Sequence, residues 1–455
     1  MATPNSFAYF FFLLGSALVY RLLPKGAKRY YLLGVSLIFY FLCCREGFWL
    51  LCLSMGANYG LGRWMEKAAR KKAILVPGLV LQLGMLAVFK YLKLFGVTLN
   101  LLMPLGISFY VFVSCGYLMD LYSGRPAERD PVSYCLFVSF FPAILSGPIE
   151  RTKTLLPQLH DLHNAGLEDY KEGLLRLVTG LFKKVLLADT LAILVDTAYA
   201  SPEAFSGLQL MVAAIAYSLQ IYFDFSAYSD MAVGAARLFG IRLTENFRAP
   251  YSAKSVKEFW RRWHIYLSGW FRDYLYFPLG GSRKGKWRTY LNIMIVFALS
   301  GLWHGAAWTF VLWGLLCGAY QVMEALLPLP ERLCRKKWFG AVQILCTFAL
   351  TTIAWVFFRS GSLSQALLIL KRILTAAGAC FPLQIGAMGL YGLRFWLVAL
   401  CSGGVLLAEG LELRERILHT TWLRYGLLVA MLLAVAVFGA YGEGYNPQEF
   451  VYFKF

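Results

Sequence analysis

Two histidines lie in apolar and aromatic surroundings that favour proton-transfer chemistry. His304 lies near the middle of a run from Asn292 to Leu316 in which no other side chain ionises, and His264 ends the motif Phe259-Trp-Arg-Arg-Trp-His264. A run of this length spans the hydrocarbon core of a bilayer, where ionisable side chains are costly and usually functional. A buried neutral imidazole accepts a proton from a hydroxyl, so the pattern indicates a general base. The alternative is that His304 only hydrogen-bonds a neighbouring helix.

Two carboxylates, Asp224 and Asp230, interrupt the apolar segment 217–230. Buried carboxylates normally exist because they are paired or hydrogen-bonded, which favours a structural role for both. Asp224 is also a candidate substrate contact.

The sequence lacks the motifs of serine hydrolases, zinc sites and disulfide frameworks. The chain has no Gly-x-Ser-x-Gly elbow and no His-Glu-x-x-His motif, and its ten cysteines lie mostly inside apolar runs without Cys-x-x-Cys spacing. We therefore predict no metal site and no bound cofactor, and direct transfer to a hydroxyl rather than a covalent enzyme intermediate.

The composition predicts a multi-pass membrane protein. Of 455 residues, 59% are hydrophobic and 15% charged, whereas soluble proteins have about 45–50% apolar and about 25% charged residues. The net charge of +19 suggests nucleic acid at first, but basic loops between spans set membrane topology, so we predict no nucleic-acid partner. The basic segments 21–29 and 63–72 are predicted to be cytoplasmic, with the N-terminus outside.

Apolar segments recur along the whole chain and predict an all-α bundle of about eleven spans plus partial or re-entrant helices. We expect one membrane-embedded domain over residues 1–455, because no polar linker separates folded parts. Pro104-Leu-Gly-Ile-Ser-Phe-Tyr110 begins with helix breakers, which fits either a re-entrant segment or an ordinary helix started by proline. The apolar runs lie near residues 7–20, 30–44, 48–62, 73–95, 104–122, 132–147, 173–199, 205–223, 291–302, 303–327, 341–358, 394–409 and 422–440.

The segment from Ser252 to Leu279 mixes basic and aromatic residues after a loop-like stretch. Its large apolar residues recur at three- to four-residue intervals, as Trp260, Trp263, Leu267 and Trp270 or Phe271, which predicts one interfacial or cavity-lining helix. Arg261 and Arg262 on it could bind donor phosphates or only follow the positive-inside rule.

These residues resemble the membrane-bound O-acyltransferase family, and within it most closely the bacterial alginate and polysaccharide O-acetyltransferase branch. The resemblance runs from about residue 1 to the aromatic end Phe450–Phe455. It rests on several motifs in the family's order: Pro104-Leu-Gly-Ile-Ser-Phe, Phe141-Pro-Ala-Ile-Leu-Ser-Gly-Pro-Ile-Glu-Arg151, Gln220-Ile-Tyr-Phe-Asp-Phe-Ser-Ala-Tyr-Ser-Asp230, Asn246-Phe-Arg-Ala-Pro250, Phe259-Trp-Arg-Arg-Trp-His264, Arg272-Asp-Tyr-Leu-Tyr-Phe-Pro-Leu-Gly-Gly281 and Leu302-Trp-His-Gly-Ala-Ala-Trp308.

The resemblance implies a helical shell around a central tunnel or funnel, in a bacterial cytoplasmic membrane. His304 matches the family's catalytic base and His264 its second motif position. Candidate substrate contacts are Trp303, Arg261, Arg262 and Asp224. The implied donor, such as acetyl-CoA or an acyl carrier, enters from the cytoplasmic side, where an acidic carrier protein is a candidate partner. The acceptor is a hydroxyl of an extracytoplasmic polysaccharide, or of a soluble hydrolase-like partner protein.

Two alternatives stay open at this point. The sister branch transfers D-alanine to teichoic acid, although Pro278-Leu-Gly-Gly-Ser-Arg-Lys284 favours polysaccharide acetylation. The other alternative is a polysaccharide or lipid transporter in which the two histidines form a proton relay. The absence of inverted sequence repeats argues against it.

Overall fold

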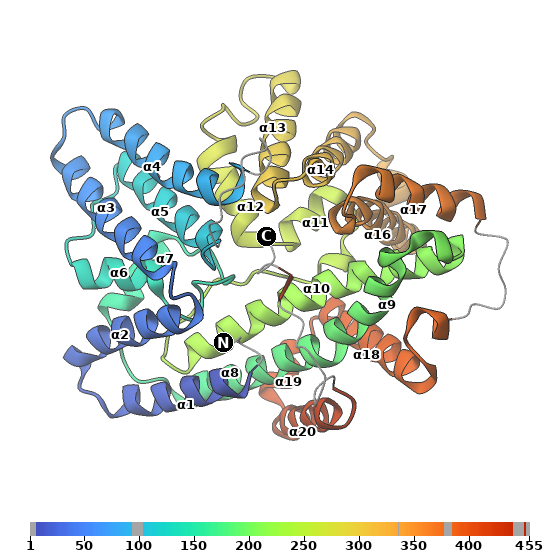
Figure 1. Cartoon of the computed structure of the whole chain (residues 1–455), viewed down its shortest axis with the longest axis horizontal. Helices are drawn as coiled ribbons and strands as arrows, with labels where there is room; N and C mark the ends of the chain where they lie inside the picture. The colour runs from blue at the N-terminus through green and yellow to red at the C-terminus, as the bar shows by residue number, and fades with distance from the viewer. Residues whose placement is uncertain (1–5, 93–102, 335, 377–384, 440–449, 452–455) are drawn as a thin grey trace. The chain divides into compact units, whose positions relative to one another are not determined.

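The computed structural model describes residues 6–92, 103–334, 336–376, 385–439 and 450–451, and every element within these ranges is helical (Figure 1). This confirms the predicted all-α class. The end of the family resemblance, beyond Val451, lies outside the described residues. The chain divides into two compact units, residues 1–180 with 228–245 and residues 181–227 with 246–451, of which the described parts are treated one by one. A single domain over 1–455 stays a prediction.

Polar contacts connect the helices of the first unit. The amide of Asn58 donates hydrogen bonds to the Tyr134 hydroxyl at 2.6 Å and to the Ser114 carbonyl at 3.1 Å. Such bonds hold helices together in an apolar medium. The helices of this unit are α1 Phe7–Leu22, α2 Lys25–Cys43, α3 Phe48–Lys67, α4 Lys72–Lys90, α5 Ile107–Tyr122, α6 Pro131–Ser139, α7 Thr152–His160, α8 Leu167–Leu181 except its last residue, and the end of α10 Gly207–Arg237.

The structure shows the conformation of two apolar segments of this unit. The helix breakers at Pro104 form a turn with Gly106 in a left-handed conformation (φ 72°), and α5 follows as an ordinary helix. The apolar run 132–147 is helical only up to Ser139, where α6 ends, and residues 141–147 form turns and a bend.

The second unit contains a helical hairpin with backbones in close contact. At Gly301 and Gly314, on facing sides of α13 and α14, an added methyl group would overlap the carbonyl oxygens of Phe310 and Phe297. Small residues at such crossings let membrane helices approach closely. The elements of this unit are a π-helix Phe182–Ala188, α9 Asp189–Ala200, the first part of α10, α11 Val256–Arg262, α12 Ile265–Phe271, a π-helix Arg272–Tyr276, α13 Lys286–His304, α14 Trp308–Leu326, α15 Glu331–Cys334, α16 Lys337–Arg359, α17 Leu363–Ala376, α18 Gly392–Gly410, α19 Arg414–His419 and α20 Thr421–Phe438, with 3-10 turns at Pro202–Ala204, Pro250–Ser252 and Ile385–Met388.

Six helices in the described part of the chain are long and apolar enough to cross a membrane: α4, α10, α14, α16, α18 and α20. α1 and α5 are apolar but shorter. A polytopic helical bundle is therefore supported, while about eleven spans and a central tunnel stay predictions.

The hairpin contact generates a stability prediction. Gly314→Ala should lower the thermal unfolding midpoint of the detergent-purified protein, because overpacking of this kind costs about 1–3 kcal/mol. Gly404→Ala in α18 is the matched control, since an added methyl there meets nothing within 4 Å. Equal midpoints for the two variants would contradict backbone contact between α13 and α14.

Candidate active site

The chain bends at His264, between two short helices. Its backbone is left-handed (φ 49°, ψ 51°), so α11 ends at Arg262 and α12 begins at Ile265. The prediction of one aromatic helix over Ser252–Leu279 is therefore wrong. A non-glycine residue in this conformation is strained, and such strain concentrates at functional sites.

Backbone hydrogen bonds from the loop that precedes α11 support this bend. The Arg248 N–H donates to the Arg262 carbonyl at 3.0 Å, and the Ile265 N–H donates to the Asn246 carbonyl at 3.0 Å. These bonds satisfy polar groups that a continuous helix would have paired internally. The loop motif that begins at Asn246 thus serves to hold the histidine corner.

The residue before the corner, Trp263, anchors it in an aromatic core. Trp263 is almost fully buried, its ring stacks on Phe259 with centroids 5.4 Å apart, and it packs against Trp355 at 5.0 Å. His264, the next residue, has other neighbours, among them Phe225 and His304.

His304 is the last residue of α13, and aromatic rings surround it. Its imidazole lies 4.8 Å from the ring of Trp303, 5.0 Å from Trp313 and 5.3 Å from Phe358, centroid to centroid. The neighbouring Gly305 leaves no room for a methyl group, which would overlap the Phe310 ring.

The structure brings the two predicted histidines together. Their ring centroids are 6.3 Å apart, and Trp303 lies beside both, 6.1 Å from His264. Phe225 covers His264 on another side at 4.6 Å. Both imidazoles are buried, with 1% and 3% of their surface exposed.

The electrostatics of this enclosure favour an uncharged imidazole at His264. Burial lowers the pKa of His264 well below its usual value, and the neighbouring His304 lowers it further. His264 is therefore neutral at pH 7. Such a site can accept a proton from a hydroxyl, and with two imidazoles close together it can pass a proton on.

Arg261 and Arg262, adjacent on α11, differ in their surroundings. The Arg262 guanidinium pairs with Glu258 at 2.7 Å and donates to the Ala249 carbonyl at 3.4 Å. Arg261 is exposed, and no ion pair involves it within the described residues. Of the two predicted phosphate contacts, only Arg261 presents an uncommitted charge.

Asp224 points into a buried charge cluster rather than toward the histidines. Its carboxylate accepts from Lys184 at 2.7 Å and from the Val451 N–H at 2.7 Å, and Lys184 also pairs with Asp189 at 2.9 Å. The ring of Phe450 lies 4.5 Å from the Lys184 ammonium. This geometry supports the structural interpretation of Asp224.

Lys184 was missed from the sequence, although it interrupts the apolar run 173–199. It lies in the π-helix Phe182–Ala188. Asp230, in the first unit, is likewise paired, with Arg176.

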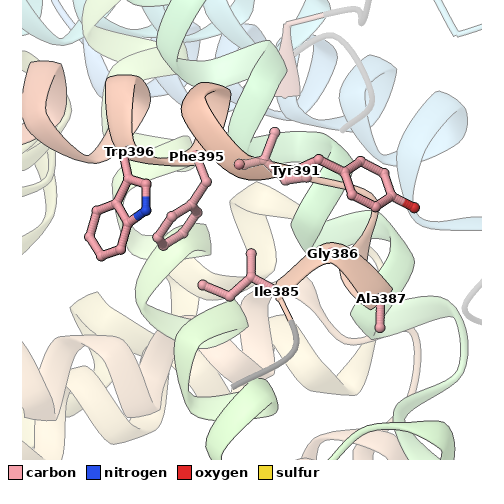
Figure 2. A pocket seen from close by; sticks show the side chains of 8 residues that line it. Ile385, Gly386, Ala387, Tyr391, Phe395 and Trp396 are labelled. Carbon is pink, nitrogen blue, oxygen red and sulfur yellow. The ribbon is translucent and has the colours of Figure 1, made fainter. Parts of the chain in front are cut away.

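A separate hollow of about 590 Å³ opens at the start of α18. Figure 2 shows the Phe395 and Trp396 side chains on one side of it, with Ile385 facing Phe395. None of the predicted site residues lines it. Within the described residues no cluster of histidine, cysteine or acidic side chains could hold a metal ion.

Comparison with known proteins identifies the family of this sequence. Residues 129–362, which include both histidines, match the model described as the membrane-bound O-acyltransferase family. The chain is 39% identical over 374 residues to the probable alginate O-acetylase AlgI of Pseudomonas putida, covering 76% of this chain and 75% of the relative. It is 37% identical over 419 residues to the peptidoglycan O-acetyltransferase of Helicobacter pylori (80% and 77%), and 30% identical over 268 residues to the teichoic acid D-alanyltransferase of Bacillus subtilis (55% and 67%).

The buried charge cluster around Lys184 predicts which of two variants is the less stable. Lys184→Met should lower the unfolding midpoint more than Asp224→Asn, because it leaves two buried carboxylates without their cation, whereas Asp224→Asn leaves the Lys184–Asp189 pair intact. Breaking a buried pair costs on the order of 3–5 kcal/mol. The exposed Lys371→Met in α17 is the control. The reverse order in thermal melts would contradict a cluster centred on Lys184.

Proposed function

Because the chain belongs to the membrane-bound O-acyltransferase family, we propose that it transfers an acetyl group to a hydroxyl of an extracytoplasmic polysaccharide or partner protein, with His304 as general base. The protein is a multi-pass O-acyltransferase of the cytoplasmic membrane. The observation that carries the proposal is the meeting of His264 and His304 in one buried aromatic enclosure.

The proposed reaction is a direct acyl transfer from a thioester. The imidazole of His304 takes the proton of the acceptor hydroxyl as its oxygen attacks the acetyl carbonyl carbon. The tetrahedral intermediate then collapses, the carbon–sulfur bond breaks, and the thiolate takes the proton from the imidazolium. The product is an O-acetyl ester and a free thiol, and no bound cofactor or metal takes part.

Burial supports this role in two ways. The aromatic enclosure excludes water, which protects the thioester from hydrolysis and strengthens electrostatic interactions at the reacting atoms. It also keeps an imidazole uncharged, as burial does at His264, and only an uncharged imidazole accepts a proton. His264 either positions the acceptor hydroxyl or carries the proton onward, and Trp303 lines the space beside both rings.

The donor is proposed to enter from the cytoplasmic side as acetyl-CoA or as an acyl group on an acidic carrier. Arg261 is the contact for its phosphate, because its guanidinium is exposed and uncommitted. Asp224, held by Lys184, is withdrawn from the substrate contacts.

Acetyl transfer is favoured over D-alanyl transfer by the relatives. The relatives named as O-acetylases match more of the chain, at higher identity, than the D-alanyltransferase. Side-by-side assays with acetyl and D-alanyl thioesters separate the two. The transporter alternative is set aside, since the family is one of acyltransferases.

The role of His304 is tested by substitution. His304→Ala should lower the turnover number by about 10²–10⁴-fold, the usual contribution of a general base, with an unfolding midpoint near wild type. The measurement is transfer of labelled acetyl groups by the purified protein. His419→Ala, at an exposed histidine in α19, is the control. Near-normal turnover of the His304 variant would remove this residue from the mechanism.

The contrast between the two arginines gives a second kinetic test. Arg261→Gln should raise the donor KM with little change in kcat, which marks lost uniform binding. Arg262→Gln removes the same charge beside it, yet should change the donor KM less, because Arg262 is already paired with Glu258. The wild-type donor KM should also rise with salt, since exposed charges are screened over about 8–10 Å. Equal effects of the two variants, or none, would contradict the assignment.

A further inference from the structure

A basic hollow lies where α3 ends and α4 begins, in the first unit. It has a volume of about 850 Å³. Three consecutive cations line it, and no carboxylate does. The lining residues are Ala68, Ala69, Arg70, Lys71, Lys72, Ala73, Val76, Pro77 and Tyr122.

The three cations of this hollow, Arg70, Lys71 and Lys72, have no ion-pair partner among the described residues. The acidic residue nearest in sequence, Glu66, is already engaged, by Arg63 at 2.6 Å and by Arg129 at 3.3 Å. The hollow therefore keeps three positive charges that nothing in its own lining neutralises.

An apolar stripe continues from the hollow along a candidate span. Val76, Val80 and Leu83, spaced i, i+4 and i+7 on α4, are 47%, 65% and 43% exposed. This spacing places them on one helix face. Tyr122 is the last residue of α5 and Trp64 lies in the last turn of α3, and both side chains are exposed. Aromatic rings of this kind are enriched at the headgroup level of a membrane.

We propose that this hollow binds the headgroup of an anionic phospholipid, with the lipid phosphate held by Arg70, Lys71 and Lys72. The lipid's acyl chains lie along the stripe Val76–Val80–Leu83. Charge complementarity favours an anionic lipid over a zwitterionic one, because a zwitterionic headgroup would bring its own cation against three others. Juxtamembrane basic clusters attract such lipids, and a hollow with an apolar continuation fits one lipid molecule rather than only a diffuse ion atmosphere.

Native mass spectrometry of the purified full-length protein tests the site. Phosphatidylglycerol should bind the wild-type protein and raise its unfolding midpoint, whereas phosphatidylcholine should do so much less. The triple variant Arg70→Gln/Lys71→Gln/Lys72→Gln should bind phosphatidylglycerol more than about tenfold more weakly, given what each cation contributes near an anionic surface. Its elution profile and acyl-transfer rate without added lipid should match wild type.

A control of equal charge separates a site from net charge. Arg332→Gln/Lys336→Gln/Lys337→Gln removes three cations that do not line the hollow, and should leave binding unchanged. Equal losses in the two triple variants would reduce the effect to overall charge and overturn the proposal. Displacement of phosphatidylglycerol by soluble coenzyme A, at an ionic strength where sodium chloride alone displaces none, would assign the hollow to a soluble phosphate ester and also overturn it.

Discussion

The left-handed backbone at His264 is the constraint on which the site depends. A non-glycine residue in this conformation costs about 1–3 kcal/mol, so it persists only where its surroundings hold it. Here the loop at Asn246 and Arg248 donates and accepts backbone hydrogen bonds on both sides of the bend, and Trp263 is stacked in an aromatic core. The strain is thus maintained by contacts that lie away from the imidazole.

The second histidine is held by backbone packing of a different kind. His304 ends α13, and the position of that end depends on the contact with α14 at Gly301 and Gly314. Both imidazoles are therefore placed by rigid backbone elements and not by long side chains. In the proposed reaction, preorganisation of this kind would hold the two imidazoles close to the positions that proton transfer requires.

Whether a charged side chain of this protein is paired depends on its surroundings. Inside the second unit, Lys184 has two carboxylates within 2.9 Å, since an unpaired charge in an apolar interior is very costly. Among the described residues, the cations Arg70, Lys71 and Lys72 after α3 have no such partners, and Glu66, close to them in sequence, is paired with Arg63 and Arg129. At the proposed lipid site a polar membrane surface would supply water and phosphate, so that internal pairing is not required. The contrast is a physical reason to look for an external anion at the α3–α4 hollow.

Sequence patterns predicted the features that depend on neighbouring residues. The apolar runs predicted helices, and the placement of His264 and His304 in apolar motifs predicted a shared site. The helix break at His264 escaped prediction because Trp260, Trp263 and Leu267 keep a helical spacing across it. What breaks the helix is hydrogen bonding to a loop that precedes it, and no local periodicity records such a partner. Lys184 was missed for a related reason: one of its two carboxylates, that of Asp224, comes from another part of the chain, and the other, that of Asp189, is its neighbour only because a π-helix ends there. The polar residues of an apolar chain are thus easy to find by eye, but their roles follow from partners that only the folded structure brings to them.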